Sequence, residues 1–129
     1  MAHYKTKAAA EYEARRVRRR LRGANWIIEV SRLDHSMPWY WTLHNGGLSL
    51  HESRGIIGPP LYWTLLAATT TTAHHGECYF EASQHHRDPN KAVAEQLANA
   101  RAFCKQVNDA LALLERNIPM MTRRRTERS

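Results

Sequence analysis

The sequence predicts an α+β protein with an antiparallel sheet of about four to five strands, covered by one long C-terminal helix and preceded by a basic N-terminal helix. Three observations predict this class. Two alternating apolar runs flank Asn45-Gly46, a dipeptide typical of β-hairpin turns. An apolar stripe with helical spacing follows Asp88-Pro89. Three of the connections between strands are short, which favours an antiparallel meander because parallel strands need a long crossover.

The first element is a predicted helix over residues 8–22 with two different sides. Helical steps of about 100° place four small or apolar residues on one narrow seam: Ala10, Ala14, Val17 and Leu21. The wide opposite surface carries six arginines: Arg15, Arg16, Arg18, Arg19, Arg20 and Arg22. Gly23 is suited to end this helix. We expect the seam to face the protein and the arginines to face outward.

The hairpin over residues 39–52 has the strongest strand pattern. With Asn45-Gly46 as the turn, the register pairs Leu43 with Leu48 and Trp41 with Leu50. One face is then apolar. The other face carries Tyr40, Thr42, His44, Ser49 and His51.

Three further segments read as strands. Residues 26–32 alternate, with Trp26, Ile28 and Val30 directed inward. Residues 61–72 are ambiguous, since a short helix over 62–68 competes with a strand, but alternation and β-branched residues favour the strand. Residues 77–83 alternate with Cys78 on the inward face.

The last element is a long helix that begins after Asp88, with Pro89 at its first position. Its apolar stripe consists of Val93, Leu97, Ala100, Cys104, Val107, Leu111 and Leu114. A stripe of this length must be buried against something, and we expect it to pack on the apolar face of the sheet. Pro119 lies just beyond the helix.

Charge is concentrated at the two ends of the chain. The 129 residues carry a net charge of +7, with +6 in residues 1–23, −2 in residues 24–118 and +3 in residues 119–129. We therefore divide the chain into a basic helical arm (1–23), a single α+β domain (24–118) and a basic tail (119–129). A nearly neutral body with two arginine-rich ends indicates a polyanionic partner.

The arginines are the main candidate site. Guanidinium groups match the geometry of phosphates, so we predict nucleic-acid or polyanion contact through the six helical arginines and through Arg123, Arg124 and Arg125. An acidic protein surface and a merely solubilising role are the alternatives. A membrane-surface role ranks low because the helix seam lacks large apolar groups.

The outward hairpin face is a second candidate. Tyr40, His44 and His51 could stack on bases, as sheet platforms do for single strands. The same composition is typical of a solvated sheet face or of a protein contact.

The histidines suggest a metal site, but the expected distance between them argues against one. His74, His75, Cys78, His85 and His86 cluster in sequence. An intervening strand would separate the two histidine pairs by about 20 Å or more, far too much for a single zinc site. A metal site formed by His85 and His86, with further ligands from other parts of the chain, remains an alternative. We predict no metal and no cofactor.

The sequence contains no catalytic signature. GxSxG, P-loop and GxGxxG motifs are missing, and we expect Cys104 to be a buried core residue. The α-β-β-β-α order resembles that of double-stranded-RNA-binding domains. Those domains carry a basic patch at the start of their last helix, where this chain has Asp88-Pro89-Asn90-Lys91-Ala92, so the resemblance does not identify the family.

Three functional hypotheses follow. The first is a small non-enzymatic binding module that contacts nucleic-acid phosphates, DNA or RNA, alone or within a nucleoprotein complex. The alternative is an inhibitor or adaptor of the kind found in phages and mobile elements, which binds a nucleic-acid-handling machine by protein–protein contact. The third, ranked low, is a histidine-based metal-dependent enzyme. With no apolar run near 20 residues, no signal peptide and only two cysteines, we expect a cytoplasmic protein without membrane contact.

Overall fold

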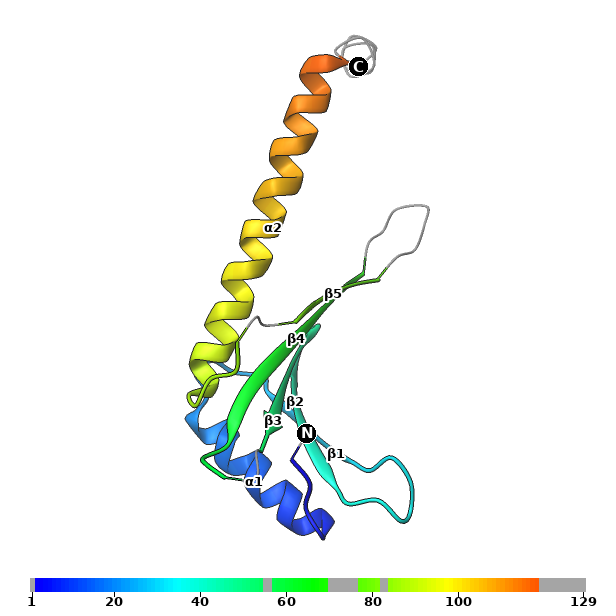
Figure 1. Cartoon of the computed structure of the whole chain (residues 1–129), viewed down its shortest axis with the longest axis vertical. Coiled ribbons are helices and arrows are strands. Elements are labelled where there is room, and N and C mark those ends of the chain that lie inside the picture. The colour runs from blue at the N-terminus through cyan, green and yellow to red at the C-terminus, as the bar shows by residue number, and fades with distance from the viewer. Residues whose placement is uncertain (1, 55–56, 70–76, 82–83, 119–129) are drawn as a thin grey trace. The chain divides into compact units, whose positions relative to one another are not determined.

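The computed structural model describes residues 2–54, 57–69, 77–81 and 84–118 (Figure 1). In chain order the elements are α1 (Lys7–Arg20), β1 (Ile27–Ser31), β2 (Tyr40–Asn45), β3 (Leu48–Ser53), β4 (Leu61–Thr69), β5 (Glu77–Glu81) and α2 (Pro89–Asn117). The predicted α+β class is confirmed, with one helix before the sheet and a long one after it. By internal contacts the chain divides into two compact units, Met1–Leu97 and Ala98–Ser129.

The sheet is an antiparallel meander. The five strands in the described part of the chain lie in the order β1-β2-β3-β4-β5, so each pairs with its neighbour in sequence (Figure 1). This confirms the predicted topology and the preference for a strand at Leu61–Thr69. Because the order is sequential, β1 is an edge strand, and this edge becomes important for the candidate site.

The hairpin between β2 and β3 has a different register from the predicted one. Leu43 pairs with Leu50 and Asn45 with Leu48, so the turn is Gly46-Gly47 and the predicted Asn45-Gly46 turn is wrong. Asn45 stays in the strand, where its side-chain amide donates to the backbone carbonyl of Ala24 at 2.9 Å. The shift moves each partner by two residues, which preserves the faces because side chains alternate with a period of two. The apolar face is therefore as predicted.

Two glycines make this turn possible. Gly46 has a φ of +61°, which suits the first central position of a type II′ turn. Gly47 packs against β4, where its carbonyl oxygen accepts a hydrogen bond from the Ala67 amide at 2.8 Å. A Cβ at position 47 would lie only 2.3 Å from the Ala67 carbonyl oxygen. The close approach of β4 therefore excludes any larger residue at this position.

Helix α1 is part of the hydrophobic core. Thr6 caps its start by accepting a hydrogen bond from the Ala9 amide at 3.1 Å. The predicted seam is buried and packs against apolar residues of the sheet: Trp41, Leu43, Leu48, Leu50 and Tyr62. The predicted orientation of the helix is confirmed, with its seam inside and its arginines outside. The helix ends at Arg20, two residues earlier than predicted.

Helix α2 begins as predicted but is buried only at its start. Asp88 accepts a hydrogen bond from the Asn90 amide at 2.9 Å and so caps the helix. Ala92 and Gln96 are fully buried, and the hydroxyl of Thr64 donates to the carbonyl oxygen of Ala92 at 3.5 Å.

Beyond this start, the predicted burial of the apolar stripe on the sheet is wrong. Leu97, Val107, Leu111 and Leu114 are between 41% and 52% exposed, and Cys104 is exposed as well. The 29-residue helix would extend about 43 Å, whereas a nine-residue strand extends about 30 Å. The apolar face of the sheet is also occupied by α1. No described strand is as long as α2.

Candidate polyanion-binding site

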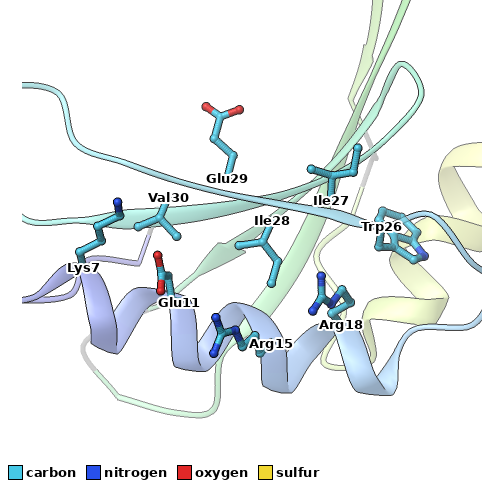
Figure 2. Close-up of a pocket in the computed structure, with 9 residues that line it drawn as sticks. All are labelled: Lys7, Glu11, Arg15, Arg18, Trp26, Ile27, Ile28, Glu29 and Val30. Atoms are coloured by element: carbon cyan, nitrogen blue, oxygen red, sulfur yellow. The ribbon is translucent and has the colours of Figure 1, made fainter.

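An open groove of about 660 Å³ runs between α1 and the edge strand β1 (Figure 2). Its lining combines basic residues of the helix with apolar and acidic residues of the helix and strand: Lys7, Glu11, Arg15, Arg18, Trp26, Ile27, Ile28, Glu29 and Val30. The residues around this space include three cations, Lys7, Arg15 and Arg18, and two acidic residues, Glu11 and Glu29. The groove is thus a cationic, partly apolar trough beside a strand edge that pairs with no other described strand.

Helical spacing explains why these basic residues share one side of the groove. Lys7, Arg15 and Arg18 are separated by eight and three residues, so they lie along a single face of α1. On β1 the residues alternate: Ile28 points toward the helix and Glu29 points away from it (Figure 2). The indole nitrogen of Trp26 donates to the backbone carbonyl of Arg22 at 3.2 Å, which ties the start of β1 to the end of α1.

Glu29 is already engaged outside the groove. Its carboxylate lies 2.9 Å from Nε2 of His44 on the neighbouring strand. Glu11 is the carboxylate that remains on the helix side of the groove. The balance of charge facing the groove from α1 is therefore positive.

The six arginines of the helix and its end are all exposed. Arg16 approaches Glu13 at a long 3.9 Å, and the Arg20 guanidinium lies 5.9 Å from the ring centroid of Tyr62. Within the described part of the chain, Arg15, Arg18 and Arg19 have no carboxylate at ion-pair distance. These three guanidinium groups keep their hydrogen-bonding capacity for an anionic partner.

A buried carboxylate lies beneath the other side of α1, and sequence reasoning did not assign it a role. Glu52 is only 2% exposed and accepts a hydrogen bond from the Tyr4 hydroxyl at 2.6 Å, with Nε of Arg54 at 3.6 Å. Burial raises the pKa of Glu52, and burial together with the Glu52 hydrogen bond raises the pKa of Tyr4. The sequence pattern does indicate that the Glu52 side chain faces inward, because Glu52 alternates with the inward-facing Leu48 and Leu50.

This cluster holds the segment that leads into α1. The Ala2 amide donates to the Glu52 carbonyl oxygen at 2.9 Å, and Tyr4 and Trp39 form a backbone bridge. The N-terminal segment is thereby tied to the sheet on one side, while Trp26 ties the other end of the helix. The helix is fixed at both ends, so its arginines are presented from a rigid support.

The other predicted contact residues, Tyr40, His44 and His51, lie on the face of the sheet that is directed away from α1. His51 stacks on Trp63 with ring centroids 4.3 Å apart, and its Nε2 lies 2.9 Å from the Ser49 hydroxyl. Burial, with a smaller contribution from the nearby His44, lowers the pKa of His51 to about 4. His51 is therefore neutral at pH 7. Because Tyr40, His44 and His51 alternate with the residues that face α1, they do not join the arginines in one site.

The remaining predicted residues are separated or lie outside the described residues. His86 contacts the carboxylate of Glu95, and the His85 ring lies 6.3 Å from that of Trp63. The side chains of His74, His75, Cys78, Arg123, Arg124 and Arg125 lie outside the described residues.

Among the residues that the structure describes, no group of three or more His, Cys, Asp or Glu side chains is arranged to hold a metal ion. No described helix combines the length and apolar character needed to cross a membrane.

Comparisons with protein-family models, with curated proteins and with solved structures gave no match to this chain. The function is therefore inferred from the geometry and charge of the site.

Proposed function

We propose that this chain is a small non-enzymatic binding module that contacts nucleic-acid phosphates through the arginines of α1. The observation that carries the proposal is the fixed display of five exposed arginines on α1, with an exposed Arg22 just beyond its end, while the other side of the helix is buried. A rigid support reduces the entropy lost when the side chains engage a ligand. Arginine forks form charge-assisted, bidentate hydrogen bonds to phosphate oxygens.

Three of these arginines are the best candidates for direct contact. Arg15 and Arg18 line the groove, and Arg19 follows them on the same outer surface. None of the three must break an ion pair with another described residue before it binds. Contacts of this kind fix position without reading bases, so binding should depend weakly on sequence and strongly on salt.

The test compares two variants with the same change in net charge. One carries Arg15→Gln, Arg18→Gln and Arg19→Gln, and the other carries Arg87→Gln, Lys91→Gln and Arg116→Gln at exposed positions outside α1. Fluorescence anisotropy measures binding to labelled single-stranded and duplex DNA and RNA over a salt series. We expect the α1 variant to lose at least about tenfold in affinity and to reduce the salt slope by about 2 to 3. Equal losses of affinity in both variants would show that binding depends on net charge and not on the arginines of α1, which would contradict the proposal.

A second candidate function is supported by the strand edge beside the groove. Within the described residues, β1 pairs only with β2, and Ile27 next to the groove is 65% exposed. An extended acidic segment of a nucleic-acid-handling protein could add to this edge while its carboxylates meet Lys7 and Arg15. In this function the chain would act as an adaptor or inhibitor.

Nuclease treatment separates the two functions. A protein partner that remains bound after complete nuclease digestion, and that is lost from the Ile27→Asp variant, would support the adaptor. Loss of every partner on digestion, with binding to purified nucleic acid retained by the Ile27→Asp variant, would support phosphate contact alone.

A further inference from the structure

The second half of α2 carries a regular heptad pattern on an exposed surface. Its apolar positions are separated alternately by four and three residues: Ala100, Cys104, Val107, Leu111, Leu114 and Ile118. From Arg101 to Ile118 every residue is exposed. The amide of Ile118 donates to the Leu114 carbonyl oxygen at 2.8 Å, so helical hydrogen bonding reaches the last of these positions. A strict 3.5-residue repeat indicates a second helix with the same repeat as partner.

We propose that this seam, residues 100–118, joins two copies of the chain in an antiparallel coiled coil. Reversing one helix about its midpoint near Asp109 places Val107 opposite Leu111 of the second copy. The same operation places Cys104 opposite Leu114 and Ala100 opposite Ile118. Each layer then combines a smaller with a larger side chain, which fills the space between the helices evenly. Symmetry repeats each layer, giving six in all.

Charge complementarity selects the antiparallel arrangement. Arg101 and Glu115 flank the seam, and both are exposed. In the antiparallel dimer Arg101 faces Glu115 of the second copy, and the pair occurs twice. In a parallel dimer these residues would face Gln96 and Ala110, neither of which is charged. A parallel dimer would also place Ala100 against Ala100 and leave a gap in that layer.

The association is tested on the full-length chain carrying Cys78→Ser, which leaves Cys104 as its sole cysteine. Sedimentation equilibrium after nuclease digestion and in high salt excludes association through nucleic acid. We expect a concentration-dependent dimer for this chain and a monomer for Leu111→Glu. Leu113→Glu is the matched control, since Leu113 lies off the seam and is 51% exposed against 50% for Leu111. The control should remain dimeric.

Cysteine cross-linking tests the orientation. In the antiparallel dimer the two Cys104 residues lie ten residues apart along the axis, or about 15 Å, which is too far for a disulfide. Adding Leu114→Cys places a cysteine opposite Cys104 of the second copy, so mild oxidation should give a covalent dimer only in that variant. The distance within one helix is also about 15 Å, which excludes an internal bond.

Four results would overturn the proposal. They are a monomer at every concentration, a trimer or tetramer, a covalent dimer through Cys104 alone, and equal disruption by Leu111→Glu and Leu113→Glu. Far-UV circular dichroism of each variant distinguishes loss of association from loss of the fold. The proposal depends only on the seam and its flanking charges in α2, so its outcome is independent of phosphate binding.

Discussion

The two helices differ in a way that their sequences alone do not suggest. The seam of α1 consists of two alanines, a valine and a leucine, yet all four residues are buried. The stripe of α2 contains more and larger apolar residues, yet Leu97, Val107, Leu111 and Leu114 are each more than 40% exposed. The number and size of apolar residues on a helix therefore do not decide whether the chain itself buries them.

Geometry explains the difference. Small residues at Ala10 and Ala14 let the backbone of α1 approach the sheet closely, and its 14 residues suit the short strands. The 29-residue α2 is longer than any described strand, and its buried residues, Pro89, Ala92 and Gln96, all lie in its first turns. The comparison teaches that one helix completes the core of the chain and the other presents a surface that a separate partner can cover.

The largest predicted effect tests the buried side of this comparison. Val17→Asp places a charge where the native side chain is 1% exposed, against the core of the sheet. We expect a loss of about 3 to 5 kcal/mol in the free energy of unfolding, because a buried charge lacks a partner. Urea titration followed by tryptophan fluorescence measures it, since all four tryptophans lie in Met1–Leu97.

The matched substitution on α2 is Leu113→Asp. Leu113 is half exposed, so the same measurement should change by less than about 0.5 kcal/mol. If Val17→Asp were equally mild, α1 would not be part of the core.

A smaller effect concerns pH. The pKa of His51 falls to about 4 in the folded chain, whereas an unfolded histidine has a pKa of about 6.5. Between these values the unfolded state binds a proton that the folded state does not, so stability is lost as the pH falls through this window. Because the ring is partly exposed, we expect a loss on the order of 1 to 2 kcal/mol.

The His51→Gln variant should lose less stability than the native chain between pH 6.5 and 4. Glu52 acts in the opposite direction, because its raised pKa favours folding as the pH falls, but it is present in both proteins and cancels in the comparison. Urea midpoints by tryptophan fluorescence at several pH values measure the difference. Identical pH profiles would show that His51 does not titrate as its burial predicts.

The smallest predicted effect concerns the proposed dimer. Arg101→Glu should weaken association by about fivefold, since it replaces two attractive pairs, each worth a few tenths of a kcal/mol, with repulsive ones. Adding Glu115→Arg should restore the native affinity in an antiparallel dimer. Sedimentation equilibrium at low salt measures both, and a double variant that associates no better than the single one would argue against this pairing.

Local patterns predicted much of this fold. Alternation identified the strands, Asp88-Pro89 located the start of α2, and the seam of α1 was correctly directed inward. The hairpin register was wrong because it depends on contacts distant in sequence: Gly47 packs on Ala67, and Asn45 bonds to Ala24. The burial of the α2 stripe was wrong because sequence spacing shows that a face needs a partner and does not show which one.

The candidate site was predictable only in part. The run of arginines was evident from composition, but the groove also needs the edge position of β1, which follows from strand order. The inward position of Glu52 could have been found from its alternation with Leu50. The stacking of His51 on Trp63 could not have been predicted from the sequence. The two rings meet because of the register between β3 and β4, which no local sequence pattern specifies.

Amide hydrogen exchange across the full-length chain at two protein concentrations tests the central comparison most directly. We expect the amides of Ala14 and Val17 in α1 to be protected equally at both concentrations, because the chain itself buries this seam. Protection of residues 104–114 in α2 should be weak at low concentration and rise at high concentration, because a second copy covers that seam. Rapid exchange throughout α1, or protection of α2 that does not change with concentration, would contradict this account.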